Sequence, residues 1–207
     1  MKLEIVQLGK YFGLRWVFRD VNFGPAGGVV GVAGANGSGK STLLRCLAGL
    51  LRQDHGSVNW IQDAGDPTDF DLRRDTGYAA PYIQLYKDLT CRENLDFLRA
   101  PFESVAGDML AYGALFNELG IGEKLDVLYK SLSSGQQQRV KIIASILNDP
   151  VVLFLDEPGT NLDVRGVEFI KNVVHERKKR NRLTIIASND PSELEWCDTV
   201  LNIENNK

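Results

Sequence analysis

The chain has 207 residues, of which 24 are Lys or Arg and 27 are Asp or Glu, and its formal net charge is −3. This length can bury the core of one large or composite domain. Because basic and acidic residues are interspersed and nearly balanced, we expect no nucleic-acid-binding surface and no nucleic-acid partner.

The cysteines and the apolar runs indicate in which cellular compartment we expect the protein. Cys46, Cys91 and Cys197 lie far apart without C-x-x-C spacing, which favours reduced thiols in a cytoplasmic protein over disulfides or a metal site. The first residues do not have the charged and apolar pattern of a signal peptide. No apolar run approaches the roughly 20 residues that cross a bilayer. We therefore expect any membrane role to come through a partner.

Short apolar runs in the first part of the chain predict strands and one helix. Residues 29–33 are typical of a buried strand, and residues 43–51 have the pattern of a helix. Gly65, Asp66 and Pro67 predict a loop. Further short strands are expected at residues 3–7, 19–23, 57–61 and 77–80.

The middle of the chain changes to helical spacing. From residue 91 to residue 132, apolar side chains recur three or four positions apart, and Gly120 and Gly122 interrupt them. We expect a helical subdomain at about residues 82–148, inserted into the core of a single domain over residues 1–207. The apolar positions are Leu95, Leu98, Met109, Tyr112, Leu115, Phe116 and Leu119.

The last part of the chain returns to short apolar runs. Residues 151–155 and 183–187 have strand length, and a helical stretch at 164–179 separates them. Strands that alternate with helices predict an α/β fold with a mostly parallel sheet covered on both faces.

A glycine-rich loop after the strand at 29–33 carries the clearest chemical signal. It satisfies G-x-x-x-x-G-K-S/T in the strand–loop–helix context of a phosphate-binding site. Its glycines let backbone N–H groups point at an anion, and the following helix adds the positive end of its dipole. Lys40 is placed to reach the β- and γ-phosphates and Ser41 to bind Mg²⁺. The expected nucleotide-binding residues are Gly34, Asn36, Gly37, Ser38, Gly39, Lys40, Ser41 and Thr42.

Two acidic residues follow the apolar run at 151–155. Asp156 and Glu157 would lie at the carboxyl edge of the sheet, where α/β folds bind ligands. Neighbouring strand residues point to opposite sides, so we expect different roles for the two acids. Asp156 would hold Mg²⁺, and Glu157 would polarise the water that attacks the γ-phosphate, a role worth about 10²–10⁴-fold in rate. The alternative is a helix N-cap.

A second helix start with small polar residues lies at Ser133, ahead of an amphipathic run that includes Val140 and Ile143. Such a terminus can bind an anion, although by itself the pattern is a weak signal, since most such sequences are ordinary N-caps.

Together these motifs resemble those of the nucleotide-binding subunits of ABC transporters over nearly the whole chain. Residues 34–42 match the Walker A loop and residues 151–157 match Walker B. Residues 132–136 match the LSGGQ signature with Ser134 in place of a glycine, and residues 157–163 resemble the stretch that leads into the D-loop.

The resemblance implies an ABC-type P-loop NTPase with an antiparallel β subdomain, ATP and Mg²⁺ as cofactors, and ATP hydrolysis. It also implies a head-to-tail dimer, with a homodimer expected, that sandwiches two ATPs. In that dimer Lys40 of one subunit would face the signature of the other. The nucleotide contacts implied outside the Walker A loop are Ser133, Gly135, Gln136 and Asp163.

An aromatic residue near the start of family members stacks on adenine. Tyr11 and Phe12 are the two candidates here, and strand alternation lets only one of them face the base. The position relative to Gly13 favours Phe12. The alternative is that both rings simply pack in a small sheet.

The chain departs from the family pattern at two positions. Pro81 replaces the glutamine expected to touch Mg²⁺ and the attacking water, and Gln84 is a possible substitute if the loop bends. Asn189 stands where a switch histidine is expected; His55 and His175 lie elsewhere. An amide can donate to the γ-phosphate but cannot become cationic. We therefore expect slow but real hydrolysis, with Glu157, Lys40 and Asn189 as the catalytic residues.

The helical insert is where transporter subunits of this family receive their transmembrane permease. Residues 82–86 are apolar and aromatic there, which is typical of an interface, although a packed loop is an equal alternative. A small subunit of this sort resembles exporter components, peripheral on the inner face of the cell membrane. Residues 80–86 and 187–191 are similar to those of the haem exporter ATPase of cytochrome c maturation.

Other functions are also consistent with the sequence. An exporter of another cargo is the main alternative to haem export. A soluble ABC ATPase, such as an iron–sulfur assembly factor, is also a single small cassette. A nucleotide-sensing module that hydrolyses little would be consistent with Pro81 and Asn189, whereas Glu157 argues against it.

Overall fold

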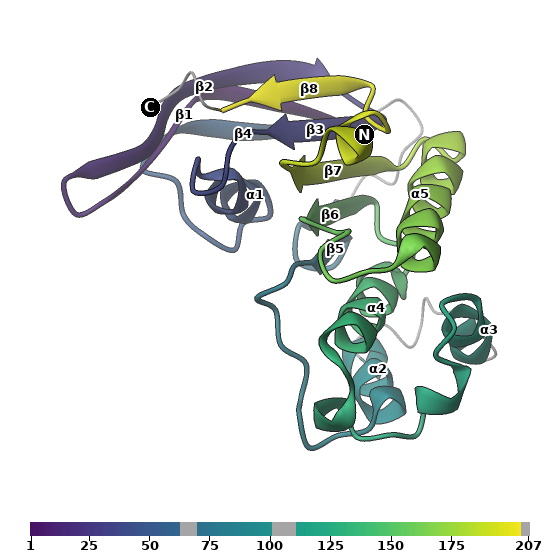
Figure 1. Cartoon of the computed structure of the whole chain (residues 1–207). Coiled ribbons are helices and arrows are strands. Elements are labelled where there is room, and N and C mark those ends of the chain that lie inside the picture. Colours follow the sequence, from purple (N-terminus) through teal and green to yellow (C-terminus); the bar gives the residue numbers. More distant parts are fainter. Residues whose placement is uncertain (63–69, 101–110, 204–207) are drawn as a thin grey trace.

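Two β-sheets form the upper part of the molecule in the computed structural model, which describes residues 1–62, 70–100 and 111–203 (Figure 1). The first sheet is antiparallel with the order β2-β1-β4. Its strands are β1 (Lys2–Phe12), β2 (Arg15–Ala26) and β4 (His55–Ile61).

The second sheet has five strands in the order β5-β6-β7-β3-β8, and every neighbouring pair is parallel. This confirms the expected parallel core. All strands therefore end at one edge, and Asp156 lies beside Ala187 there. The strands are β3 (Val29–Ala33), β5 (Thr76–Ala79), β6 (Val152–Asp156), β7 (Leu183–Ser188) and β8 (Thr199–Asn202).

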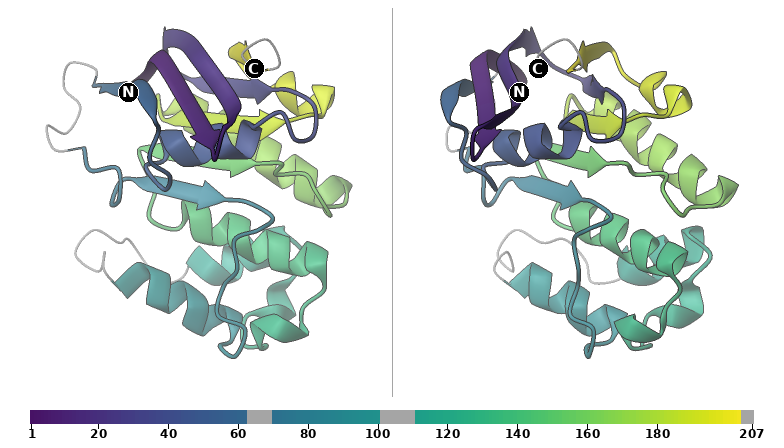
Figure 2. Two further views of the ribbon diagram at one scale, coloured as in Figure 1. Left: turned by 90° about the vertical axis from the view of Figure 1, so that its left-hand side faces the viewer. Right: turned by 60° about the vertical axis from the view of Figure 1, so that its left-hand side comes forward.

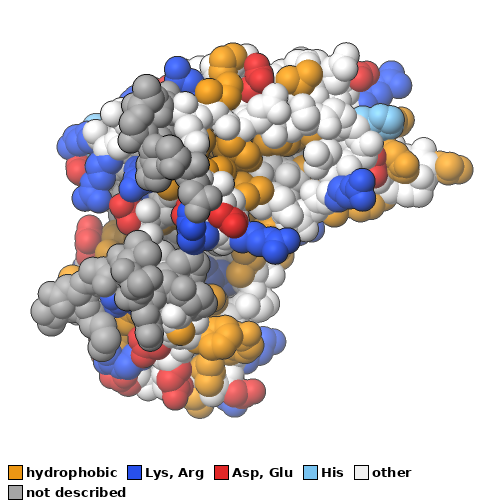
Figure 3. Space-filling model, turned by 180° about the vertical axis from the view of Figure 1, so that it is seen from behind, with side chains coloured by type: hydrophobic (Ala, Val, Ile, Leu, Met, Phe, Trp, Pro, Cys, Tyr) orange, Lys and Arg blue, Asp and Glu red, His pale blue; other side chains and the backbone are white. Residues whose placement is uncertain are grey.

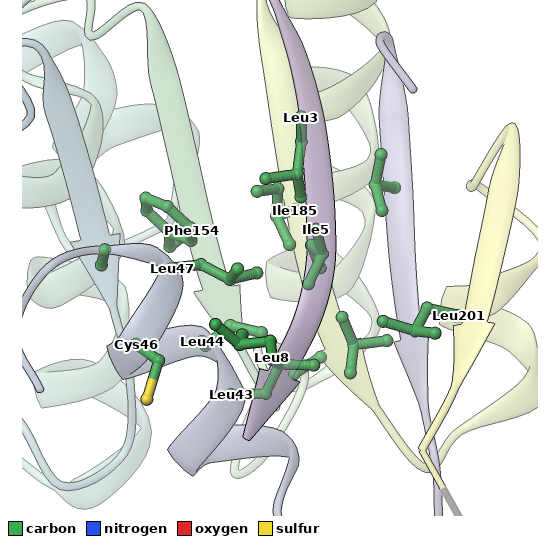
Figure 4. Packing of buried hydrophobic residues seen from close by; sticks show 14 of the residues in the cluster. Leu3, Ile5, Leu8, Leu43, Leu44, Cys46, Leu47, Phe154, Ile185 and Leu201 are labelled. Atoms are coloured by element: carbon green, nitrogen blue, oxygen red, sulfur yellow. The ribbon is translucent and has the colours of Figure 1, made fainter. Parts of the chain in front are cut away.

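Strand alternation sends the side chains of the parallel sheet into two hydrophobic clusters. Phe154 and Ile185 face a cluster that fills the space between the two sheets, together with helix α1 (Lys40–Leu47). Leu153 and Ile186 face the opposite cluster, which contains helix α5 (Val164–Lys179) and side chains of the helical part. Both faces of this sheet are thus covered, as expected for central parallel strands. Figure 4 shows the first cluster, with Leu3, Ile5 and Leu8 of β1 against Leu43, Leu44 and Leu47 of α1.

The helical part lies beyond the β5 edge of the parallel sheet (Figures 1 and 2). It contains α2 (Cys91–Arg99), α3 (Ala111–Glu118) and α4 (Ser134–Ile146), with short 3-10 turns at Gly122–Lys124 and Tyr129–Ser131. Thr90 and Ser133 begin α2 and α4 with capping boxes, in which a side chain three residues later bonds back to the cap. After β7, the short helix α6 (Pro191–Leu194) leads to β8.

Two sequence expectations need correction. The helix expected at 43–51 begins at Lys40 and ends at Leu47, because Gly49 adopts a left-handed backbone with φ 68° that stops it. The strand expected at residues 19–23 is longer, because β2 runs from Arg15 to Ala26. The loop expected at Gly65, Asp66 and Pro67, and the apolar position Met109, lie outside the described residues.

Candidate active site

The glycine-rich loop joins β3 to α1. Gly37 and Gly39 have φ values of 76° and 107°, a region that glycine adopts without strain. Gly39 occupies the N-cap position of α1 without a side-chain cap. A Cβ on Gly39 would lie 2.7 Å from the Val17 Cγ1, so a side chain there would press on β2. The N-terminus of α1 is therefore open toward the loop, as a phosphate-binding terminus requires.

The Lys40 side chain lies inside the loop and bonds to the loop's own backbone. Its ammonium group donates hydrogen bonds to the Gly34 carbonyl oxygen at 2.8 Å and the Ala35 carbonyl oxygen at 3.3 Å. It also lies 3.1 Å from Glu157 Oε1. Lys40 is only 5% exposed, so its charge is directed into the loop and not into solvent. An anion bound in the loop would meet this charge directly.

Ser41 and Asp156 form an oxygen pair suited to a hard cation. The Ser41 hydroxyl donates to Asp156 Oδ1 at 3.0 Å across the junction of α1 and β6. Burial raises the pKa of Asp156, and the hydrogen bond from Ser41 partly offsets this. Asp156 Oδ2 is buried and has no hydrogen-bond partner among the described residues. Because Mg²⁺ binds through one or two protein oxygens together with phosphate and water oxygens, this pair fits it.

Glu157 turns away from the strand that ends at Asp156. Its φ of 47° lies in the left-handed region, at a cost of about 1–2 kcal/mol for a residue with a Cβ. Its N–H bonds to the Ala187 carbonyl oxygen at 2.8 Å, which fixes the turn. The side chain thereby reaches Lys40 over the loop, while Asp156 stays buried. The two acids occupy different environments because Glu157 leaves the strand in a left-handed turn, and not because of strand alternation.

These elements surround a cavity of about 530 Å³. Of the residues expected from the sequence, the structure brings eight to its wall: Asn36, Gly37, Gly39, Lys40, Ser41, Thr42, Glu157 and Asn189. Gly34, Ser38 and Asp156 lie directly behind this wall, through the contacts of Lys40 and Ser41 and the packing of Ser38 against Gly34.

The two positions that depart from the family pattern both line the cavity. The Asn189 amide donates to Asn36 Oδ1 at 2.9 Å, so it is held at the mouth of the loop. Pro81 contributes only its ring and carbonyl. Gln84, considered as its substitute, is instead part of the wall of a second cavity and is not brought to the first.

Tyr11 and Phe12, the two aromatic candidates for stacking on adenine, lie on opposite faces of the hairpin formed by β1 and β2. A register shift next to Val17 leaves Tyr11 opposite Trp16 and Phe12 opposite Arg15. Tyr11 packs edge-on against Trp16, with ring centroids 5.3 Å apart. Phe12 shares the face of Lys10, whose ammonium lies 5.2 Å from its ring centre, and it remains 56% exposed. Neither ring lines the cavity, although Val17 of the neighbouring strand does.

The signature residues lie away from this cavity in the same chain. Ser133 caps α4 and exchanges hydrogen bonds with Gln136. Gly135 approaches the next loop closely, since a Cβ there would lie 2.6 Å from the Asn161 carbonyl oxygen. Asp163 caps α5 and accepts a hydrogen bond from Arg139 at 2.6 Å. The structure thus places Asp163 in helix contacts of its own chain.

Sequence reasoning missed three residues of this region. Val17 and Thr160 line the cavity, and Tyr82 lies next to it, with its hydroxyl 2.7 Å from the Tyr78 hydroxyl and its ring over the Arg45 guanidinium. Val17 lies at the register shift between β1 and β2, which the sequence pattern does not reveal. Tyr82 was noted in the sequence only as part of an apolar segment.

The comparisons with known proteins agree with this geometry. A family model described as ABC transporter matches residues 18–160. The chain is 35% identical over 178 residues to "Probable multidrug ABC transporter ATP-binding protein YbhF" of Escherichia coli, covering 85% of the chain but only 31% of that protein. It is 31% identical over 220 residues to "Putative hemin import ATP-binding protein HrtA" of Staphylococcus haemolyticus, covering 100% of the chain and 99% of the relative.

Solved structures show the same fold. The dimeric ABC transporter cassette MJ0796 aligns with a TM-score of 0.79 at 24% identity, over 98% of this chain and 95% of that one. CbiO1 of Clostridium perfringens, part of the complex cbiONQ, aligns with a TM-score of 0.71 at 28% identity, over 97% of this chain and 83% of that one.

None of the described helices is long and apolar enough to span a membrane. The phosphate loop, the Ser41–Asp156 pair and the family match over residues 18–160 lead to one assignment. The chain belongs to the ABC transporter family and is one of its ATP-binding domains, of the ATPase class.

Proposed function

We propose that this chain hydrolyses MgATP in a head-to-tail dimer and uses the cycle to drive a transmembrane permease. The observation that carries the proposal is the convergence of Lys40 and Glu157, 3.1 Å apart, over the open N-terminus of α1. A phosphate-binding cation and a carboxylate are thereby placed at one point of the cavity wall.

The ion pair between Lys40 and Glu157 suggests an order of events. A γ-phosphate that enters the loop attracts Lys40, which releases the Glu157 carboxylate. Glu157 can then accept a proton from the attacking water. Ser41 and Asp156 would hold Mg²⁺, which supplies positive charge to the phosphate oxygens. Asn189, held at the loop by Asn36, donates from its amide to the γ-phosphate.

Adenine would stack on Phe12 in this proposal. Phe12 and Lys10 lie on the same face of β1, and the Phe12 ring is exposed. Val17 of the neighbouring strand β2 lies at the register shift and lines the cavity. Tyr11 is engaged with Trp16 on the other face. Gly34, Ser38 and the loop residues that line the cavity would bind the phosphates.

In the proposed dimer, the signature residues of one subunit contact the nucleotide bound to the other subunit. Ser133, Gly135 and Gln136 lie outside the cavity of their own chain, so they can reach a nucleotide only in another copy. Asp163 would act at this interface by holding Arg139 and the start of α5. We propose a homodimer, because one chain carries both halves of the site.

We propose that the permease binds in a groove beside the helical part. It has a volume of about 410 Å³ and includes Arg73, Gln84, Tyr86, Phe97 and Lys141 in its wall. Tyr86 and Phe97 are 55% and 54% exposed, and their rings meet at 5.0 Å. A short amphipathic segment with an apolar face and an acidic residue would complement these aromatic and basic side chains. Seen from behind, the molecule is hollowed between its upper and lower parts, with acidic and basic side chains interspersed on this face (Figure 3).

We place the chain at the inner face of the cell membrane, bound through this groove, as part of an exporter. Relatives are described as multidrug, lantibiotic and hemin transport proteins. HrtA supports haem as one cargo, although its description gives import as the direction. Haem export for cytochrome c maturation rests on sequence similarity at residues 80–86 and 187–191. A soluble iron–sulfur assembly ATPase is the alternative.

Extraction of the tagged chain from native membranes with mild detergent, followed by mass spectrometry, tests the transporter role. Stoichiometric recovery of a multi-span membrane protein is expected. The variant Phe97→Asp should abolish this recovery. The matched control is Val200→Asp, which places the same charge on a 47% exposed apolar residue of β8 and should not abolish it. Recovery with soluble partners only would contradict the proposal and favour the assembly factor.

A further inference from the structure

The end of β1 that carries Phe12 is bonded to the segment between α1 and β4. The Asp54 N–H donates to the Gly9 carbonyl oxygen at 2.9 Å, and Asp54 Oδ2 accepts from the Tyr11 N–H at 2.9 Å. Asp54 therefore bonds to the backbone of β1 on both sides of Lys10. Because this segment follows α1, whose N-terminus opens on the phosphate loop, these contacts link the proposed adenine site to the phosphate site.

The Lys10 side chain reaches the same segment. Its ammonium group donates a hydrogen bond to the Arg52 carbonyl oxygen at 2.8 Å and lies 3.1 Å from Asp54 Oδ2. Only 8% of Lys10 is exposed. A charge that is buried to this extent needs such partners, because an unpaired charge away from water is strongly destabilising. The two contacts therefore hold the ammonium group at one point beside β1.

This ammonium group lies over the Phe12 ring. The distance from Lys10 Nζ to the ring centre is 5.2 Å, within the roughly 6 Å at which an aromatic face attracts a cation. The two residues are two positions apart in β1, so they share a face of the strand. Phe12 is nevertheless 56% exposed. Lys10 thus engages one side of the ring, while much of the ring surface stays available to a base.

The other rings near the hairpin end form a separate cluster. Tyr11 packs edge-on against Trp16, with ring centroids 5.3 Å apart, and Trp16 lies 5.4 Å from the His55 ring. Tyr11 points to the strand face opposite to Phe12, so this cluster leaves Phe12 on the Lys10 side. The hairpin therefore presents Phe12 with a cation behind it, and not as a member of the aromatic cluster.

We propose that Lys10 is a positioning residue for the nucleotide base, which holds the Phe12 ring from one face so that adenine stacks on the other. The inference rests on the proposed stacking of adenine on Phe12. The ammonium group draws the electron density of the ring towards itself, so the free face becomes less negative and stacks better on an electron-rich base. Lys10 thereby adds to the affinity for a purine base and not to the affinity for the phosphates.

The test compares the dissociation constants of ADP and inorganic pyrophosphate in Mg²⁺, each measured by displacement of a fluorescent ADP analogue. The ratio of the pyrophosphate constant to the ADP constant measures how much the adenosine part strengthens binding. Lys10→Met keeps the length of the side chain and removes its charge. It should lower this ratio about twofold to fivefold, the size expected for one cation over an aromatic ring. The pyrophosphate constant should stay at the wild-type value, and Lys10→Arg should keep the wild-type ratio.

A double-mutant cycle with Phe12→Ala separates a positioning role from a general effect on the fold. If Lys10 acts through Phe12, Lys10→Met should not lower the ratio further once the ring is absent. Lys130→Met is the matched control, because it also removes a lysine that forms an ion pair, with Asp88 at 2.7 Å, but in the helical part. This control should keep the wild-type ratio.

A wild-type ratio in Lys10→Met, or the same loss with and without the Phe12 ring, would overturn the inference and leave the proposed function standing. Equal weakening of ADP and pyrophosphate binding in Lys10→Met would also overturn it, because the charge would then act on the phosphates. If Phe12→Ala by itself keeps the wild-type ratio, the proposed stacking fails, and the inference fails with it.

Discussion

Glu193 offers a sharp test of how the active-site loop is held. This residue of α6 is only 4% exposed, and its Oε1 accepts a hydrogen bond from the Gly159 N–H at 2.8 Å. A Cβ on Gly159 would overlap the Glu193 carboxylate, so a side chain there would displace that carboxylate. Gly159 lies two residues after Glu157. Glu193 therefore fixes the loop that carries the proposed base.

Glu193→Ala leaves the partly buried Gly159 N–H without its acceptor. Such a loss costs about 1–3 kcal/mol. At about 2–4 °C per kcal/mol for a chain of this size, the melting temperature should fall by about 2–12 °C. Because the loop of Glu157 loses its anchor, kcat should fall about tenfold to a hundredfold while ATP affinity is kept.

Glu193→Gln removes the negative charge of the side chain but keeps a hydrogen-bond acceptor. Its amide oxygen can still accept from Gly159. Burial raises the pKa of Glu193, so the folded state holds the proton more tightly than the unfolded state. The buried carboxylate therefore costs stability as pH rises from the ordinary glutamate pKa through the raised one. Glu193→Gln should melt at or above the wild-type temperature at pH 8, with a smaller advantage near pH 5.

Differential scanning calorimetry at both pH values and steady-state ATPase kinetics measure these effects. Wild-type melting temperature and kcat in Glu193→Ala would refute the reasoning. Equal losses in the Ala and Gln variants would show that the charge, and not the hydrogen bond, holds the loop.

Three further predictions follow from the site and the core. Phe12→Ala should weaken ATP binding about threefold to tenfold with little effect on kcat, since stacking contributes about 0.5–1.5 kcal/mol; unchanged affinity in a fluorescent-nucleotide titration would contradict the stacking role. Asn189→Ala should lower kcat about tenfold, and turnover equal to wild type would remove Asn189 from the catalytic residues. Burial raises the pKa of each cysteine thiol to about 11, so native protein at pH 8 should react with a thiol reagent about a hundredfold more slowly than urea-unfolded protein, and a fast native phase would contradict the burial of Cys46 and Cys91 and the partial burial of Cys197.

The sequence predicts the parts of the site that are contiguous in the chain. The glycine loop and the acidic pair each lie at the end of an apolar strand, so local pattern alone places them at one sheet edge. The strands β3 and β6 and the helix α5 follow from apolar runs of the right length and period. Ser133 as a helix start is also visible locally, through its capping box with Gln136.

Contacts between distant segments could not be predicted in this way. Glu193 meets Gly159 across 34 positions, and only the parallel pairing of β6 with β7 brings them together. Tyr82 of the loop after β5 meets Arg45 of α1, a contact that no spacing rule encodes. The proposed substitute Gln84 has suitable chemistry but is directed to the other cavity.

The most direct test of the central claim is ATP turnover by purified protein and by the variant Glu157→Gln. Gln keeps the length of the side chain and removes the carboxylate that would accept the proton. The account predicts measurable turnover in the wild type, a fall of about 10²–10⁴-fold in the variant, and an ATP-dependent dimer of the variant on a sizing column. Turnover unchanged by Glu157→Gln would contradict the assignment of the base, and a variant that stays monomeric with ATP would contradict the head-to-tail dimer.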